Sequence, residues 1–396
     1  MTRRLTLVGA PAAALFLASC ALVRGGLFDE HRYGDVGLYA HYAHEMTAGR
    51  WPYGDFYDVY PPLAQPLFLV VRLLPGTFAP GFKWTMALCG AAAVLVLVAA
   101  LLAVGASLSR VALAAAVVAV SPLLVGPVFL NTYDLFPALL TVGAVLAFLH
   151  GRDRLTVVLL ALAVAAKIFP LVLLPLVLVE VWERGGREAV QRALAWFAGV
   201  LVLVHVPFLI MGAGGLRFSY TQQLRRGLEV ESLAGGVLLV LDRLGLHQVT
   251  LRDQALGSRD AVGSLADALA TLSSLVVIAA VLLVAWLYLR GRRDTLVAAA
   301  ASVTAFVAFS KVLSPQYLVW LVPLVPAAGL AASGVLVATL ALTHAEWSRF
   351  VESHGTVDQW GHALSWWILA RDLVLVALYV LLVLKLRTGS RLRSRH

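Results

Sequence analysis

Three aspartates are the residues of this sequence best suited to chemistry. Asp35, Asp55 and Asp58 lie in two short segments, the second of which ends in Tyr60 and a Pro-Pro turn. Both segments follow the first hydrophobic stretch of the chain. A loop that only connects two helices does not need carboxylates, tyrosine rings and a restricted backbone together. This loop therefore predicts a site for a polar ligand, and a sugar suits it best.

Asp35 stands at the start of a segment, about 35–49, that reads as a short helix lying at a membrane surface. A carboxylate there can take a proton from an acceptor hydroxyl, which is the work of a general base. Aspartate is also a favoured N-cap of helices. Position alone leaves both roles open, and we take Asp35 as the candidate catalytic residue.

Asp55 and Asp58 lie between two proline positions, where aspartate commonly forms turns. Their alternative role, shared with Tyr60, is to bind and orient sugar hydroxyls. The spacing Asp-x-x-Asp differs from the Asp-x-Asp pair that holds a metal-bound nucleotide sugar. We therefore expect no metal ion and no cofactor.

Two further charges, Asp134 and Lys167, follow or precede hydrophobic segments at the same predicted face. A charge near the bilayer surface can reach water at little cost, so an interface anchor or a structural ion pair is the simpler role. Contact with a phosphate or a sugar is the other role, and both residues are kept as candidates.

A second group of candidates surrounds Ser314-Pro315. The proline frees backbone groups there, Lys311 supplies a point charge for a phosphate, and Gln316 and Tyr317 supply hydrogen-bonding groups. His344, beyond the next hydrophobic stretch, is also placed among the residues that could line a substrate site.

Composition points to a membrane protein. Of the 396 residues 61% are hydrophobic and 13% are charged, against about 25% charged in soluble domains. The net charge of +9 comes from basic residues scattered among short loops, which is typical of the positive-inside rule and not of a nucleic-acid-binding stripe. We predict one integral membrane domain over 1–396.

Hydropathy and the distribution of Lys and Arg predict an all-α polytopic bundle of about 12 transmembrane helices. The first outer loop, 24–82, carries interfacial helices over about 35–49 and 63–74. A second outer region spans 212–263, and a basic tail, 385–396, lies inside. The predicted transmembrane helices are 5–23, 83–105, 111–129, 135–150, 155–166, 169–182, 193–211, 267–289, 295–310, two within 316–343, and 363–384. All candidate residues then fall on the outer face.

Several of these segments resemble one known family. They are Asp35-x-x-x-Tyr39, Pro52-Tyr53-x-Asp55-Phe56 with Tyr60-Pro61-Pro62, Tyr133-Asp134-Leu135-Phe136-Pro137, Lys167-Ile168-Phe169-Pro170, and Ser314-Pro315-Gln316-Tyr317 with Trp320. Together they resemble the GT-C glycosyltransferases, and most closely family 87, the polyprenyl-phosphate-mannose-dependent mannosyltransferases common in actinobacteria.

The resemblance implies a GT-C fold with a catalytic aspartate in the first outer loop, here Asp35. It implies a polyprenyl-phosphate sugar as donor, a cell-envelope lipid or glycan as acceptor, and an inverting reaction without a metal. It also implies the plasma membrane of a bacterium, with the site facing outward and membrane lipids as partners. In the mycobacterial phosphatidylinositol-mannoside enzymes a His-containing segment follows Ser-Pro, whereas this chain has Gln316-Tyr317-Leu318. The acceptor therefore stays open.

A transporter or flippase of lipid-linked sugars is the alternative from another class, and an inactive assembly partner is a third. Transporters commonly show internal repeats and ionisable residues near the middle of the membrane. We find no repeat in the sequence, and the acidic residues gather at one predicted face. The pattern therefore favours the enzyme.

Overall fold

The computed structural model describes residues 2–27, 34–126, 128–253, 258–291, 294–352 and 357–391. Residues 28–33 of the predicted first outer loop, 254–257 of the second outer region and 392–396 of the basic tail lie outside the described residues. The chain forms two compact units, Met1–Arg225 and Arg226–His396. Each unit is described by itself, and the predicted single domain stays a prediction.

The first unit is a bundle of apolar helices. After α1 (Thr2–Arg4), a continuous helical segment, Leu5–Leu27, contains α2 (Ala10–Leu22). It packs on α5 (Phe78–Ala103) and α6 (Leu108–Val125), and α5 also packs on α8 (Leu135–Leu149). The short α7 (Val128–Asn131) precedes α8, and α9 (Asp153–Ala166) packs against α8.

The longest helix, α10 (Leu174–Leu224), follows the 3-10 turn η4 (Phe169–Leu173). Its backbone leaves helical geometry at Gly185 and Gly186, and again at Gly212. The first break lies between two of the predicted helices, 169–182 and 193–211.

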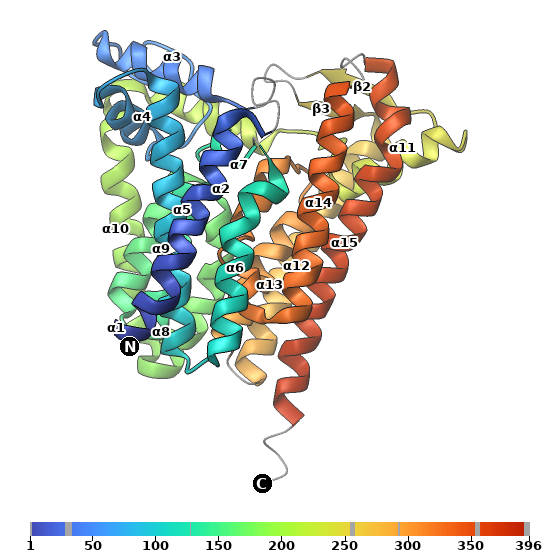
Figure 1. Ribbon diagram of the computed structural model, residues 1–396. Coiled ribbons are helices and arrows are strands. Elements are labelled where there is room, and N and C mark those ends of the chain that lie inside the picture. The colour runs from blue at the N-terminus through green and yellow to red at the C-terminus, as the bar shows by residue number, and fades with distance from the viewer. Residues whose placement is uncertain are drawn as a thin grey trace. The chain divides into compact units, whose positions relative to one another are not determined.

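Two short helices lie outside the bundle of the first unit. They are α3 (Val36–Thr47) and α4 (Ala64–Leu73), which pack on each other and on α5. Figure 1 shows α3 across the end of the first unit, beside the start of α5. Both helices occupy the positions predicted for interfacial helices in the first outer loop.

The second unit begins with a small sheet that was not predicted. Its strands are β1 (Leu228–Glu229), β2 (Thr250–Asp253) and β3 (Arg259–Val262), in the antiparallel order β1-β3-β2. The strands are two to four residues long and are an addition to the predicted helical bundle. Leu228, Ala261 and Leu238 of α11 (Leu233–Arg243) share one apolar cluster, so burial of this face holds the sheet against the helix.

Four long helices complete the second unit: α12 (Ser264–Arg290), α13 (Thr295–Phe309), α14 (Leu330–Glu352) and α15 (Val357–Arg391). The Ala-rich α13 packs against α12 and α15, and most of its residues are buried. The 3-10 turns η5 (Pro315–Trp320) and η6 (Val325–Ala328) lie between α13 and α14. They replace the first of the two helices predicted within 316–343.

Among the described residues, six helical segments are long and apolar enough to cross a membrane, and four shorter apolar helices accompany them. The prediction of an α-helical polytopic membrane protein is confirmed. The helix predicted to end near residue 343 is longer than expected: α14 runs on to Glu352, so His344 lies within a helix and not in a loop. Cys20 lies in α2 and is buried there.

Candidate functional site

Asp35 immediately precedes α3, in the N-cap position, but its side chain makes no capping hydrogen bond. The backbone holds the residue instead: its N–H donates to the carbonyl of Asn131 at 3.1 Å. Gly34 permits this approach, because a Cβ there would lie 2.3 Å from the Cβ of Asn131, and its φ is +121°. The carboxylate is therefore positioned by a contact with another part of the unit and is not used to cap its own helix.

Two tyrosine hydroxyls bind that carboxylate. Tyr60 donates to Oδ2 at 2.7 Å, and Tyr39, one turn into α3, donates to the same oxygen at 3.4 Å. Burial and the nearby Tyr39 and Asp35 raise the pKa of Tyr60 well above its usual value. Tyr60 therefore stays a hydrogen-bond donor at neutral pH.

Tyr39 and Tyr60 belong to an aromatic cluster. Tyr39 stacks on Phe68 of α4 at 4.5 Å between ring centroids and meets Tyr133 edge-on at 5.7 Å. The ring of Tyr60 lies 5.2 Å from that of Tyr133. Edge-on and offset ring pairs are the favoured geometries of aromatic residues. The cluster joins the loop, α3, α4 and the start of α8, and so fixes the surroundings of Asp35.

Asp134 and Lys167 form an ion pair in the first unit, with Nζ 2.6 Å from Oδ1. The Asp134 side chain is fully buried, and that of Lys167 is 13% exposed. Lys167 also lies over the ring of Tyr133, 4.8 Å from its centroid. Asp134 and Lys167 therefore form the structural ion pair considered for them. A role in substrate binding stays a prediction.

Asp55 and Asp58 have different surroundings. Asp55 is exposed, and its Oδ2 accepts the N–H of Trp51 at 2.7 Å, which closes a turn. Asp58 is buried, and its Oδ1 accepts the N–H of Tyr60 at 2.8 Å. Burial raises the pKa of Asp58 to about 8, although the Tyr60 N–H and the Gln65 amide counteract part of the effect. Both side chains thus make the turn contacts expected of aspartate near proline.

The second group of candidates lies in the second unit. The side chain of Tyr317 stacks on Trp320 at 4.1 Å and interacts with Arg226. Arg226 forms an ion pair with Glu229 at 3.2 Å, and the carbonyl of Lys311 accepts the N–H of Glu229 at 2.9 Å. Partial burial lowers the pKa of Lys311, and the nearby Asp260 counteracts this. Cationic groups therefore gather beside Ser314-Pro315. Gln316 is half-buried in η5, and His344 is half-buried in α14.

One buried ionic network was missed. Arg371 of α15 donates to Asp372 at 2.9 Å, to Glu346 at 3.0 Å, and to the carbonyl of Glu231. All four residues are buried. Arg371-Asp372 within an otherwise apolar segment was the available signal, because charges in transmembrane segments are rare and are kept for a purpose.

Comparison with known proteins finds solved structures with weak similarity to this chain and one protein family whose profile matches it. No curated protein matches the chain. The solved structure of ArnT from Cupriavidus metallidurans bound to undecaprenyl phosphate is 16% identical, with a TM-score of 0.49, over 97% of this chain and 77% of that one. The apo form is 14% identical, with a TM-score of 0.49, over 98% and 78%.

The match to a family profile is the stronger finding. The profile of glycosyltransferase family 87 matches residues 59–315, well over half of the chain. It covers Tyr60, the Asp134–Lys167 pair and the region up to Pro315. The family expected from the sequence motifs is confirmed, and this multi-pass membrane protein belongs to glycosyltransferase family 87.

Proposed function

We propose that this membrane glycosyltransferase moves a hexose, with mannose expected, from a polyprenyl-phosphate sugar to a lipid or glycan acceptor of the bacterial cell envelope. The site faces outward from the plasma membrane, and no metal ion takes part. The family membership supports a transferase over the transporter considered above. The observation that carries the proposal is the Asp35 carboxylate, which is held by two tyrosine hydroxyls and left out of the capping of α3.

Asp35 acts as the general base in this proposal. Among the described residues, the tyrosine hydroxyls that bind the carboxylate both donate to Oδ2, so Oδ1 is the oxygen for the acceptor hydroxyl. As Asp35 takes the proton, the acceptor oxygen attacks the anomeric carbon of the sugar. The bond from that carbon to the phosphate oxygen breaks, and the polyprenyl phosphate leaves with the bonding electrons. Attack opposite the leaving group inverts the anomeric centre.

Lys311 binds the phosphate of the donor in the same proposal. The donor phosphodiester carries one negative charge, and the departing phosphomonoester carries more. A cation beside it gains attraction as the reaction proceeds, which lowers the barrier. The lowered pKa of Lys311 reflects partial burial, and a buried cation gains more from an anionic ligand than an exposed one.

Asp35→Asn tests the assignment of the base. The amide keeps the size and can still accept from the tyrosines, but it takes no proton. We expect transfer of radiolabelled mannose from the polyprenyl-phosphate donor to extracted envelope lipids to fall about 10²–10⁴-fold, with donor binding retained. Glu188→Gln removes a carboxylate whose side chain is 85% exposed and should leave transfer unchanged. Near-normal transfer by Asp35→Asn would overturn the assignment.

Lys311→Met tests the phosphate contact. Methionine keeps the apolar stem and removes the charge, so the maximal rate should fall and inhibition by added polyprenyl phosphate should weaken. Lys311→Arg should keep part of both. Lys83→Met, at a lysine in α5 of the first unit, is the matched control. If Lys311→Met retains the wild-type rate and product inhibition, the phosphate is bound elsewhere, and Arg226 becomes the next candidate.

A further inference from the structure

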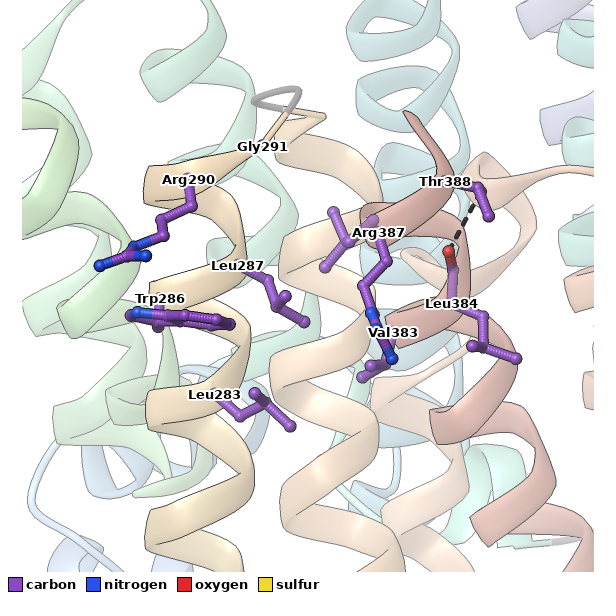
Figure 2. Close-up of a pocket in the computed structure, with 10 residues that line it drawn as sticks. Leu283, Trp286, Leu287, Arg290, Gly291, Val383, Leu384, Arg387 and Thr388 are labelled. Atoms are coloured by element: carbon purple, nitrogen blue, oxygen red, sulfur yellow. Dashed lines mark hydrogen bonds between the residues drawn. The ribbon is translucent and has the colours of Figure 1, made fainter. Parts of the chain in front are cut away.

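A histidine lies inside an apolar membrane segment of the first unit. Charged groups at the ends of such segments are ordinary, because long side chains there reach the bilayer surface. Figure 2 shows two of them in the second unit, Arg290 and Arg387, at the ends of the spans in α12 and α15. His205 of α10, in contrast, is the only ionisable residue of 193–216. A polar side chain in such a position is costly without partners and is commonly kept for a function.

Both ring nitrogens of His205 have partners. Nδ1 lies 2.7 Å from the carbonyl oxygen of Leu201, which can only accept, so Nδ1 carries the proton of the neutral ring. Nε2 is then the acceptor, and the hydroxyl of Tyr220 donates to it at 2.8 Å. The two rings are also stacked, with their centroids 5.9 Å apart. The neutral imidazole is therefore fully hydrogen-bonded only while Tyr220 donates to it.

The hydrogen bond between His205 and Tyr220 closes a sharp bend in α10. In a straight helix two residues 15 positions apart are separated by about 22 Å, which is more than their side chains can span. Two features of the sequence permit the bend. Pro207 removes one backbone hydrogen bond of the helix, and the backbone leaves helical geometry at Gly212. The hydrogen bond thus fixes the turns after the bend against those before it.

The turns after the bend are in contact with the first outer loop. Tyr220 packs against an apolar cluster that contains Tyr53 of this loop together with Leu216 of α10. Further along the loop, the ring of Tyr57 meets that of Phe218 edge-on, with the centroids 5.4 Å apart. The loop therefore lies on helical turns whose position depends on the bend.

The same loop leads to the proposed base. The hydroxyl of Tyr53 donates to the carbonyl of Tyr60, and the hydroxyl of Tyr60 donates to Oδ2 of Asp35 at 2.7 Å. A path of hydrogen bonds and packed side chains within the first unit therefore joins the bend in α10 to the carboxylate.

We propose that His205 and Tyr220 are positioning residues for Asp35. Their hydrogen bond fixes the bend in α10, and the bend holds the loop that presents Tyr60 to the carboxylate. The inference rests on the proposed function, since it takes Asp35 as the base. A small displacement of a reacting group can lower a rate by about 100-fold. Loss of the bond should therefore slow transfer, although the pair acts only through the loop.

Tyr220→Phe tests the bond, because it removes the hydroxyl and keeps the ring. Hydrogen exchange of the full chain in detergent, followed by mass spectrometry, should show the backbone of residues 51–60 exchanging about fivefold faster, as expected for the loss of one hydrogen bond. The maximal rate of mannose transfer should fall about tenfold, with the KM for the polyprenyl-phosphate donor unchanged. A lower rate at constant KM is the effect of a displaced base and not of weaker donor binding.

Variants of His205 test the bond from its other side. His205→Gln can place an amide oxygen near the position of Nε2 and should keep most of the wild-type rate, whereas the shorter His205→Asn should behave like Tyr220→Phe. The double variant, His205→Asn with Tyr220→Phe, should be no worse than either single one, because both changes remove the same bond.

Tyr379→Phe is the matched control. The hydroxyl of Tyr379 donates to the carbonyl of Ala280 in the second unit, so its loss also removes one hydrogen bond between side chain and backbone. This variant should have a lower melting temperature, but the exchange of residues 51–60 and the transfer rate should stay as in the wild type.

Two results contradict the proposal. Wild-type exchange of residues 51–60 in folded Tyr220→Phe would show that the bond does not hold the loop. Faster exchange with an unchanged transfer rate would show that the loop does not position the base. If Tyr220→Phe does not fold, His205→Asn gives the same comparison. Failure of the proposed base appears separately, as retained transfer in Asp35→Asn, and does not alter the exchange expected here.

Discussion

The three aspartates of the first outer loop have different partners, and the partners separate their roles. Asp55 is exposed and closes a backbone turn. Asp58 is buried and accepts the N–H of Tyr60. Asp35 is half-buried and receives hydroxyl groups, not backbone groups, from its own loop. Asp35 thus combines partial access with a carboxylate held by side-chain hydroxyls and not by a backbone turn, an arrangement that suits a general base.

Asp58 should make the stability of the protein depend on pH. Its folded-state pKa is about 8 because of burial, whereas an unfolded aspartate has a pKa of about 3.9. Between these values the folded chain holds a proton that the unfolded chain has lost. The stabilisation is therefore complete below about pH 4 and is lost as the pH rises to about 8. Asp58→Asn removes the titrating group, and its melting temperature should decrease less than that of wild type over this range.

Thermal unfolding in detergent at several pH values between about 5 and 8 measures this difference. Asp55→Asn serves as the control, because it changes an exposed carboxyl in the same loop and should follow the wild-type slope. If Asp58→Asn keeps that slope as well, the carboxyl of Asp58 is ionised in the folded protein and the argument from burial is wrong.

Single residues could be predicted only as far as their types and neighbours in sequence allow. Asp35 as a candidate base, and the ion pair as one role for Asp134 and Lys167, could be inferred from charges placed near membrane surfaces. The hydrogen bond from Tyr60 to Asp35 could not, because it joins residues 25 positions apart through a folded loop. The network of Arg371 also depends on tertiary contacts with Glu346 and Glu231.

At the scale of elements, helix α10 sets the shape of the loop that holds Asp35. A Cβ at Gly215 would lie 1.9 Å from the carbonyl oxygen of Tyr53, so the loop rests directly on the helix backbone. Tyr53 has φ +66°, a conformation that costs energy in a residue with a side chain. Its hydroxyl donates to the carbonyl of Tyr60. The contact with α10 is thereby connected to the residue that binds Asp35.

Gly215→Ala should therefore move the turn at Tyr53 and disturb the site. We expect a loss of about 1–3 kcal/mol in stability, the usual cost of overpacking, together with a lower transfer rate. Gly214→Ala is the matched control, because a Cβ at Gly214 meets no atom within 4 Å and alanine favours the helix. Melting temperature and initial transfer rate measure both effects. Equal behaviour of the two variants would show that the loop does not depend on this contact.

Long elements were easier to predict than short ones. The apolar runs of α5, α8 and α12 exceed or approach the length of a bilayer crossing, so hydropathy alone located them within a few residues. The strands are two to four residues long and show no extended alternation, so nothing in the sequence distinguished them from loop. The 3-10 turns η5 and η6 took the place of a predicted helix because prolines at 315, 323 and 326 interrupt the apolar run.

At the scale of the whole molecule, the two residues proposed for the reaction belong to different units. Asp35, the proposed base, belongs to Met1–Arg225, whereas Lys311, the proposed phosphate ligand, belongs to Arg226–His396. The two proposed roles can therefore be tested separately, one variant in each unit. The two variants should differ accordingly: Asp35→Asn should spare donor binding, and Lys311→Met should weaken the interaction with the polyprenyl phosphate product.

The orientation of the first unit in the membrane decides whether its site can face outward. Asp35, Asp134 and Lys167 gather at one end of that unit, with exposed Asp55 in the same loop as Asp35. Exposed Arg152 lies beyond the full length of α8 from Asp134. After removal of Cys20 and Cys89, Asp55→Cys should react with an impermeant maleimide in intact cells, and Arg152→Cys only after permeabilisation. The reverse pattern would place the Asp35 site on the cytoplasmic face and contradict transfer on the outer surface.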